Sequence, residues 1–363
     1  MLVKGKQIVR KDIKNILLIQ LGDIGDVVLS FPCIRALKEN FPKSNVIVAV
    51  REKAKELIED CPWASGVISV NKEKRKLGLE IIYQKNFFSR LRKFNFDLAI
   101  DLRTGTRGAI LALFSGARQR IGRFTDDGLL WRNRVFTHLV SPLDEINHYA
   151  AEYSINVLSP LNLNIRDRVP VLIVQSKRKK MALSILKREK VPFDRPIIAI
   201  HPCSLWKYKE WRTSEFVSLI DYISINYNCT VVITGSKEER RRIKEMIKKC
   251  KTRVFNLAGR TSIGTLPGVL QVCKLFIGID TGALHLAAAI GIPTIGIFGP
   301  SSPINWAPRG DQHSVVSKHM ECVPCRQKGC DNSETSRCLD ELTLNEIKEI
   351  LNKQIEKISL KQK

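Results

Sequence analysis

The stretch from residue 275 to residue 300, LFIGIDTGALHLAAAIGIPTIGIFGP, constrains the fold more than any other part of the sequence. It reads as a short apolar strand at 275–279, a polar turn at 280–282, a helix of small residues at 283–290 and a second buried strand at 294–298. This order predicts a βαβ unit. The turn then lies at the carboxyl end of a strand and the amino end of a helix, where unpaired N–H groups favour an anion such as a diphosphate.

The turn itself contains the candidate ligand-binding residues of this unit. Gly282 lets the backbone approach a ligand, and Thr281 and His285 are candidate side-chain donors. The alternative is purely structural, with Asp280, Thr281 and Gly282 forming a helix N-cap and His285 serving as a core histidine.

A second strand, turn and helix occupy residues 15–41 near the amino terminus. The apolar run NILLIQL is followed by a glycine-containing turn, and the apolar residues after it share one helical face. These residues are Val27, Phe31, Ile34, Leu37 and Phe41. Gly25 leaves room for a ligand, and Asp26 lies at the start of the helix and faces that space. Asp26 is alternatively an ordinary carboxylate at a helix amino end, where the dipole favours it.

The rest of the chain continues the alternation of strands and helices. Expected elements include strands at 46–50, 67–70 and 96–102 and helices at 53–60, 107–115 and 148–158, and a second series begins after a turn-rich linker at 160–170. This predicts an α/β protein of two doubly wound domains facing a cleft. We expect domains at 1–165 and 166–342, with a cysteine-rich loop at 322–338 and a C-terminal helix at 343–363; the basic insert at 72–93 has no assigned role.

Charge points to an anionic partner. The 363 residues include 60 basic and 36 acidic side chains, a net charge of +24, which suits nucleic acid, an anionic membrane surface or a phosphorylated substrate. The long uncharged run at 283–308 is interrupted by glycine and proline, and the first residues lack the apolar core of a signal peptide. We therefore expect a cytoplasmic protein.

Five segments together resemble glycosyltransferase family 9, the ADP-heptose:lipopolysaccharide heptosyltransferases. They are ILLIQLGDIGDVVLSFPCIRALKENFP, DLRTGTRGAILALFSGARQRIGR, HPCSLWKYKEWRTSEF, the long segment from NLAGRT to NWAPRG, and CVPCRQKGC. The resemblance runs from about residue 16 to residue 342 in the order and spacing of the family. It implies a GT-B fold with two Rossmann-like domains, the acceptor on the first and the nucleotide-sugar on the second, and an inverting, metal-independent transfer without a cofactor.

The resemblance also implies roles for individual residues. Asp26 matches the catalytic aspartate, with Asp23 beside it as a departure from the family pattern and a second candidate base. Lys209 matches the lysine that holds the diphosphate, and Asp280 the donor-site aspartate, expected near the donor sugar or the turn backbone. Further donor-binding candidates are Ser204, Gly235, Ser236, Glu238 or Glu239, Thr281, Gly282 and His285; acceptor-binding candidates are Gly25, Arg103, Arg107 and Arg123.

One dense cysteine set stands near the carboxyl end. Its spacing, Cys322-x2-Cys325-x4-Cys330-x7-Cys338, suits structural zinc, and free thiols or a stress-formed disulfide are equally open alternatives.

These features favour a glycosyltransferase over two other classes of protein. The leading interpretation is transfer of heptose from ADP-heptose to an anionic lipid-linked glycan, with charge-driven binding to an anionic membrane surface at its cytoplasmic face. A close alternative is transfer of another sugar from another nucleotide. A nucleic-acid-binding protein would need interleaved aromatic stacking positions, and a nicotinamide dehydrogenase would need G-x-G-x-x-G after the first strand; the sequence shows neither.

Overall fold

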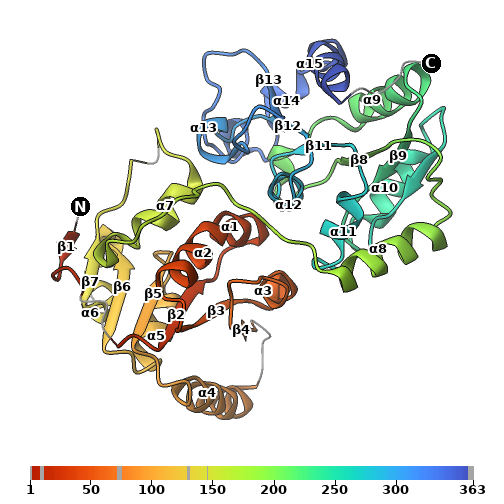
Figure 1. Cartoon of the computed structure of the whole chain (residues 1–363). Coiled ribbons are helices and arrows are strands. Elements are labelled where there is room, and N and C mark those ends of the chain that lie inside the picture. The colour runs from red at the N-terminus through yellow and green to blue at the C-terminus, as the bar shows by residue number, and fades with distance from the viewer. Residues whose placement is uncertain (1, 9–11, 72–75, 129–130, 145, 359–363) are drawn as a thin grey trace. The chain divides into compact units, whose positions relative to one another are not determined.

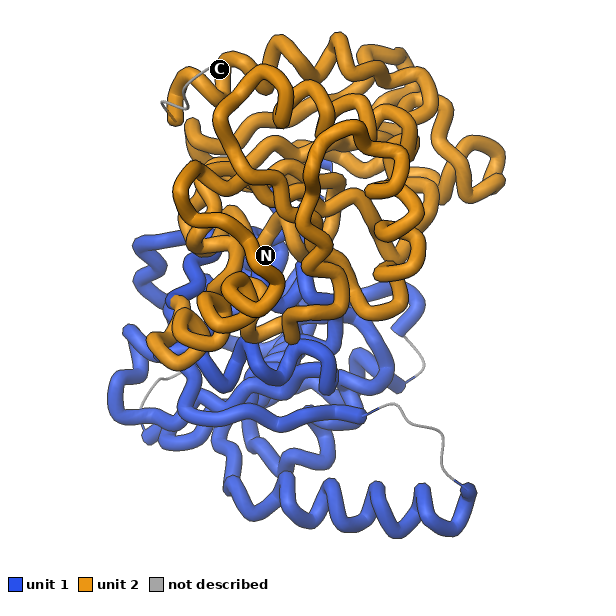
Figure 2. The backbone as a smooth tube through the Cα atoms, turned by 90° about the vertical axis from the view of Figure 1, so that its right-hand side faces the viewer, with its two compact units in different colours: residues 1–173 blue, residues 174–363 orange. Residues whose placement is uncertain are grey.

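The computed structural model describes all residues except 1, 9–11, 72–75, 129–130, 145 and 359–363. The chain divides into two compact units, residues 1–173 and residues 174–363 (Figure 2). Each unit is built on one sheet of mainly parallel strands with helices packed against it (Figure 1). The α/β class that the alternating pattern predicts is therefore confirmed.

The sheet of unit 1 has seven strands in the order β1-β7-β6-β5-β2-β3-β4, and only the β1–β7 pair is antiparallel. The strands are β1 Leu2–Lys4, β2 Asn15–Gln20, β3 Asn45–Arg51, β4 Gly66–Val70, β5 Leu98–Asp101, β6 Gln119–Arg123 and β7 His138–Val140. The first parallel strand, β2, has β3 on one side and β5 on the other. The strand order therefore reverses at β2 and β5, and such a reversal opens a ligand crevice at the carboxyl ends of the strands.

Short helices connect these strands. They are α1 Ile24–Leu29, α2 Phe31–Asn40, α3 Lys55–Glu59, α4 Leu77–Arg92, α5 Thr106–Phe114, α6 Arg132–Val135 and α7 Ala150–Asn156, with 3-10 turns η1 Glu52–Ala54, η2 Asp126–Gly128 and η3 Ser159–Leu161. Of the basic insert, residues 72–75 lie outside the described residues and α4 forms most of the rest.

The structure confirms the buried face predicted for the first helix, but this segment forms two helices and not one. The five apolar residues that share this face are all buried. The helix nevertheless divides at Ser30, whose hydroxyl donates to the Val27 carbonyl oxygen at 2.7 Å, and α2 begins with Pro32 in its first turn. A proline has no N–H for an intrahelical bond, so it favours a new start at this point.

The sheet of unit 2 has six parallel strands in the order β10-β9-β8-β11-β12-β13. The strands are β8 Ile197–His201, β9 Thr230–Ile233, β10 Val254–Asn256, β11 Leu275–Ile279, β12 Thr294–Phe298 and β13 His313–Ser317. All residues of β11 and β12 are buried, as expected for parallel strands covered on both faces. The order reverses at β8 and β11, and in open α/β sheets ligands bind at the carboxyl ends of strands at such a reversal.

Helices of unit 2 cover its sheet and include the C-terminal segment. They are α8 Ser176–Arg188, α9 Thr213–Asn226, α10 Arg240–Ile247, α11 Leu266–Leu270, α12 Gly282–Ala289, α13 Pro303–Trp306, α14 Arg337–Asp340 and α15 Leu344–Lys357, with 3-10 turns η4 Lys207–Lys209 and η5 Cys330–Asn332. The βαβ unit predicted for 275–298 is present as β11, α12 and β12. Helix α15 buries Ile347, Leu351 and Ile355 in the core of unit 2. Across the described parts of the chain, every helix is too short or too polar to cross a bilayer.

Candidate active site

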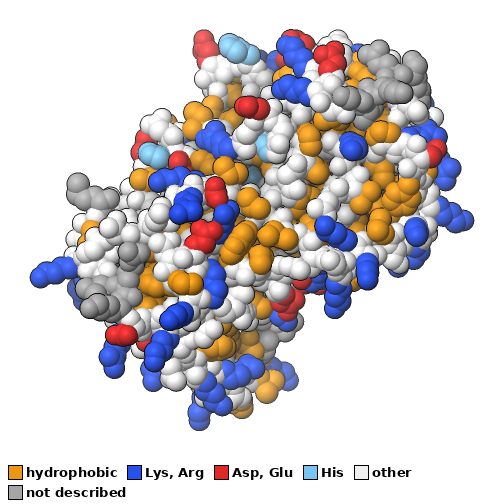
Figure 3. Space-filling model, viewed as in Figure 1, with side chains coloured by type: hydrophobic (Ala, Val, Ile, Leu, Met, Phe, Trp, Pro, Cys, Tyr) orange, Lys and Arg blue, Asp and Glu red, His pale blue; other side chains and the backbone are white. Residues whose placement is uncertain are grey.

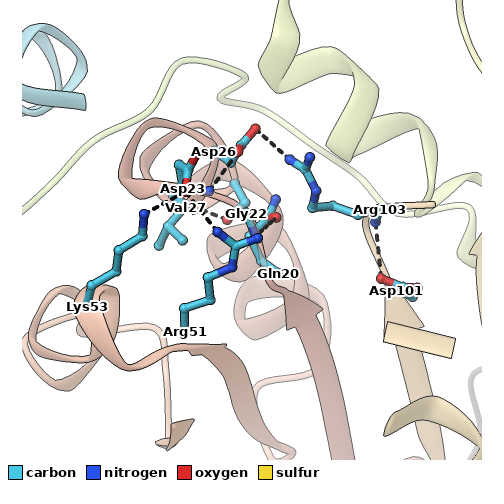
Figure 4. A network of polar contacts seen from close by, with 10 residues as sticks. Gln20, Gly22, Asp23, Asp26, Val27, Arg51, Lys53, Asp101 and Arg103 are labelled. Atoms are coloured by element: carbon cyan, nitrogen blue, oxygen red, sulfur yellow. Dashed lines mark hydrogen bonds and ion pairs between the residues drawn. The ribbon is translucent and has the colours of Figure 1, made fainter. Parts of the chain in front are cut away.

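The turn after β2 is held by hydrogen bonds to its own side chains (Figure 4). The Gly22 amide donates to Gln20 Oε1 at 3.1 Å, and the Asp23 amide donates to Asp26 Oδ2 at 2.8 Å. A Cβ atom on Gly22 would overlap the Asp26 carboxylate, so only glycine leaves that carboxylate its place. Asp26 therefore stands at the first turn of α1, as predicted, and its second oxygen remains available for another partner.

Two carboxylates lie at this turn, and their surroundings differ. Asp23 Oδ1 is 2.9 Å from Arg51 Nη1 and 2.6 Å from Lys53 Nζ. Partial burial alone would raise the pKa of Asp23, but Lys53, Arg51 and Arg103 together lower it. Asp26 Oδ1 has one cationic partner, Arg103 Nη1 at 2.8 Å. Asp23 is already neutralised by two cations and Asp26 by one, so the arrangement favours Asp26 for proton transfer.

A buried ion pair supports the loop that carries Arg103. Asp101 ends β5 with 1% of its side chain exposed, accepts a hydrogen bond from the Arg103 amide at 3.2 Å and lies 3.5 Å from Arg132 Nη2. Arg132 also donates to the Arg103 carbonyl oxygen at 2.8 Å. Burial raises the pKa of Asp101 to about 7 despite the nearby arginines. Because both partners hold its backbone, Arg103 is fixed where it meets Asp26.

The other arginines predicted for the acceptor have different partners. Arg107 donates to the Asn71 carbonyl oxygen at 2.9 Å, and the Arg123 guanidinium lies over the Tyr153 ring at 5.7 Å. Gly25 lies within the first turn of α1. Sequence reasoning missed Gln20, Arg51, Lys53, Asp101 and Arg132 as parts of this site. Three of them had a usable signal, since Gln20, Arg51 and Asp101 are the last residues of β2, β3 and β5.

In unit 2, Lys209 and Asp280 form a partly buried ion pair. Lys209 Nζ lies 2.6 Å from Asp280 Oδ2, with 20% of the lysine side chain and 4% of the aspartate side chain exposed. His285 Nε2 is 3.8 Å from Asp280 Oδ1. Burial would raise the pKa of Asp280, but Lys209 and His285 lower it, so the carboxylate is ionised. The structure thus places Asp280 on Lys209, a contact that the sequence did not predict.

The loop that carries Lys209 is anchored on both sides. Trp211 is buried, and its indole Nε1 donates to the Leu342 carbonyl oxygen at 2.8 Å. Ser336 Oγ donates to the Tyr208 carbonyl oxygen at 2.6 Å. These contacts fix η4 beside the carboxyl end of β11, although 71 positions separate Lys209 from Asp280 in sequence.

Two buried hydroxyl groups, one after β11 and one after β12, lack a hydrogen-bond partner among the described residues. Thr281 Oγ1 and Ser302 Oγ are buried, and neither has a hydrogen-bond partner among the described residues. Thr281 is the N-cap of α12, which begins at Gly282, and Ser302 is the N-cap of α13. Buried hydroxyls normally find a partner, so two at one sheet edge indicate a polar ligand there. With Lys209 and the amino end of α12, they suit the oxygens of a diphosphate.

The turn after β9 distinguishes its two glutamates. The Ser236 amide donates to Glu239 Oε2 at 2.7 Å, and the Glu239 amide donates to Ser236 Oγ at 3.3 Å, so Glu239 closes the turn that starts at Gly235. Glu238 is exposed. Ser204 lies in the loop after β8, where its amide donates to Glu210 Oε1 at 2.8 Å. Glu210 also pairs with Arg242 Nη2 at 2.5 Å, a contact missed from the sequence.

The C-terminal cysteines are free thiols in one loop. Burial first, and then the neighbouring Cys325, Cys330 and Cys322, raise the pKa of Cys338 to about 11. The loop reaches the segment that follows β12 through Arg326, whose amide donates to the Pro300 carbonyl oxygen at 2.7 Å. Over the described ranges, no three Cys, His, Asp or Glu side chains are placed to hold a metal ion. Zinc binding by these four cysteines stays a prediction.

Two Rossmann-like units with polar groups at their strand ends have the architecture of the GT-B fold. A glycosyltransferase family 9 structure from Veillonella parvula superposes with a TM-score of 0.79 at 21% identity, covering 97% of this chain and 99% of that one. The Escherichia coli ADP-heptose lps heptosyltransferase II gives 0.76 at 22% identity, covering 94% and 99%. These likenesses show the fold.

Sequence comparison identifies the family. Residues 85–335 match glycosyltransferase family 9 (heptosyltransferase), and the chain belongs to this family. Lipopolysaccharide heptosyltransferase 3 of Escherichia coli is 26% identical over 78% of this chain and 83% of its own length. Lipooligosaccharide heptosyltransferase 2 of Campylobacter jejuni is 25% identical over 91% and 96%. The family resemblance predicted from the sequence motifs is confirmed.

Proposed function

We propose that the enzyme transfers heptose from ADP-heptose to an inner-core acceptor of lipopolysaccharide, with inversion at the anomeric carbon and without a divalent metal. The observation that carries the proposal is the anion site of unit 2, formed by Lys209, the amino end of α12 and the unpartnered hydroxyls of Thr281 and Ser302. In a chain that belongs to the heptosyltransferase family, a diphosphate is the anion expected there. The relatives named above as lipopolysaccharide and lipooligosaccharide enzymes support the acceptor.

The chemical step assigns one role to each unit. The acceptor hydroxyl attacks the anomeric carbon, the bond from that carbon to the diphosphate oxygen breaks, and ADP leaves with the bonding electrons. Asp26 takes the hydroxyl proton as the general base. Lys209 and the amino end of α12 stabilise the negative charge that develops on the diphosphate, a task that other transferases give to Mg²⁺.

The acceptor determines where the enzyme acts. Inner-core acceptors are lipid-anchored and negatively charged, so we propose that the enzyme works at the cytoplasmic face of an anionic membrane. The net charge of +24 supports this partner, because basic side chains near an anionic bilayer contribute about 1 kcal/mol each.

A thermal-shift panel of nucleotides and nucleotide sugars tests the donor. We expect ADP and ADP-heptose to raise the melting temperature selectively, because a ligand at about 100 times its dissociation constant stabilises the folded state by about 2.7 kcal/mol. UDP, GDP and their sugars at the same concentration are the controls. Selective stabilisation by one of those instead would support the alternative, a transferase of this family that uses another nucleotide-sugar.

A further inference from the structure

Helix α4 packs against unit 1 through only one of its sides. Phe87 and Leu91 are buried, and Phe88 reaches the Phe114 ring on α5 with 4.6 Å between ring centroids. Tyr83 stacks on Phe87 at 6.2 Å, which extends this contact toward the middle of the helix. These residues recur every three to four positions, so they form a single buried stripe and hold the helix in place.

The first two turns of α4 expose large aliphatic side chains. Leu77 is 80% exposed, Leu79 60%, Ile81 61% and Ile82 58%. A single exposed leucine is ordinary on a protein surface, but four such side chains within six residues form an apolar patch that calls for a partner. Figure 3 shows hydrophobic side chains among Lys and Arg side chains where α4 lies.

The charges around this patch identify the kind of partner. Between residues 76 and 93 there are five basic residues and one acidic residue. The basic ones, Lys76, Lys85, Arg90, Arg92 and Lys93, are all exposed, and the acidic one, Glu80, is half-buried beside Gln84. Exposed aliphatic side chains bury apolar area at a membrane interface, and nearby lysine and arginine are attracted to anionic headgroups.

The end of α5 exposes further apolar side chains beside the last turns of α4. Leu113 and Phe114 are exposed by 43% and 42%, and Arg92 Nε on α4 donates to the Phe114 carbonyl oxygen at 3.4 Å. Arg118, also exposed, follows soon after in the sequence. Basic and apolar side chains are thus exposed along α4 and also on the neighbouring helix that contacts its last turns.

We propose that α4 is a membrane-docking helix, which inserts its first two turns into the headgroup region of an anionic bilayer and places its basic residues against the phosphates. The inference rests on the proposed function only in that a lipid-linked acceptor requires work at a membrane. It adds an apolar component to binding. Charge alone predicts complete release by salt, whereas buried aliphatic side chains retain their contribution at high salt.

Vesicle sedimentation of the full chain tests this proposal. The variant Ile81→Gln/Ile82→Gln keeps good helix formers and removes two exposed apolar side chains. Its matched control, Leu183→Gln/Ile225→Gln, removes two exposed apolar side chains from α8 and α9. On vesicles of phosphatidylglycerol and phosphatidylcholine we expect the α4 variant to bind at least about tenfold more weakly, since burying one such side chain already contributes more than a factor of ten.

The salt dependence of binding and a second variant distinguish electrostatic attraction to the vesicle from insertion of apolar side chains. Lys85→Gln/Arg90→Gln should weaken binding at low salt and leave the salt-resistant fraction, whereas Ile81→Gln/Ile82→Gln should remove that fraction. Equal binding by wild type and the isoleucine variant, or equal weakening by the α8 and α9 control, would overturn the proposal. So would a wild-type dimer that the isoleucine variant dissociates while vesicle binding stays unchanged.

Transfer assays distinguish a failure of the membrane-docking proposal from a failure of the proposed function. With a deacylated, water-soluble acceptor the isoleucine variant should match the wild-type rate, and with acceptor embedded in vesicles it should be slower. Normal transfer with unaltered vesicle binding would refute docking by α4 alone. Failure of the wild type to transfer heptose to either acceptor would refute the proposed function and leave the vesicle result standing.

Discussion

Replacing Asp26 by Asn is expected to reduce turnover by roughly 10²- to 10⁴-fold, the range that a general base contributes, with ADP affinity nearly unchanged. An amide oxygen can still accept the hydrogen bond from the Asp23 amide, so the amino end of α1 should keep its shape. The amide cannot take a proton from the acceptor hydroxyl. Steady-state rates and calorimetric ADP binding measure the two effects separately.

Asp23→Asn is the matched control, because it changes the neighbouring carboxylate in the same turn. Asp23 already neutralises Arg51 and Lys53, and we expect a smaller loss of turnover from this variant. If Asp26→Asn turns over normally while Asp23→Asn is inactive, the base has been assigned to the wrong carboxylate.

Lys209→Ala is expected to weaken ADP binding and to slow transfer together. In the proposed function the lysine contacts the diphosphate in both the ground state and the transition state, and removing one such donor costs about 3 kcal/mol in comparable sites. The variant should also lose stability, because it leaves the buried Asp280 carboxylate without its 2.6 Å partner. Breaking a buried pair from one side costs about 3–5 kcal/mol.

A double variant separates these two effects. Lys209→Met/Asp280→Asn removes both charges, so its melting temperature should recover while ADP affinity stays low. Wild-type ADP affinity in the double variant would mean that Lys209 serves only as the counterion of Asp280. In that case the diphosphate must be bound by other groups.

Local sequence patterns predicted the secondary structure well where the apolar positions in the sequence are also the buried positions in the fold. The run at 275–298 folds as predicted because buried parallel strands are continuously apolar and the turn between strand and helix is marked by Thr281 and Gly282. The break at Ser30 escaped prediction, because the periodicity of apolar residues continues across it while Pro32 restarts the helix. Helix α4 was anticipated only as a basic insert, because its apolar residues are not confined to one helical face.

The sequence alone could not predict which charged side chains contact each other within each site. Arg103 could be proposed as a cation near the acceptor, but its contact with Asp26 depends on β5 lying next to β2. Lys209 and Asp280 meet because β8 and β11 are neighbours in the sheet. Cysteine spacing shows which ligand sets are possible, and only the folded loop shows whether the four thiols converge.

The most direct test of the proposed function is a transfer reaction in excess EDTA. Purified enzyme, ADP-heptose and a heptose-deficient inner-core acceptor are incubated, and mass spectrometry and ADP release are followed together. We predict that the acceptor gains the mass of one heptose for each ADP released, at the same rate with and without EDTA. An unmodified acceptor with ADP-heptose, alongside efficient transfer from a different nucleotide-sugar, would contradict the donor assignment, and activity restored only by added Mg²⁺ would contradict metal-independent transfer.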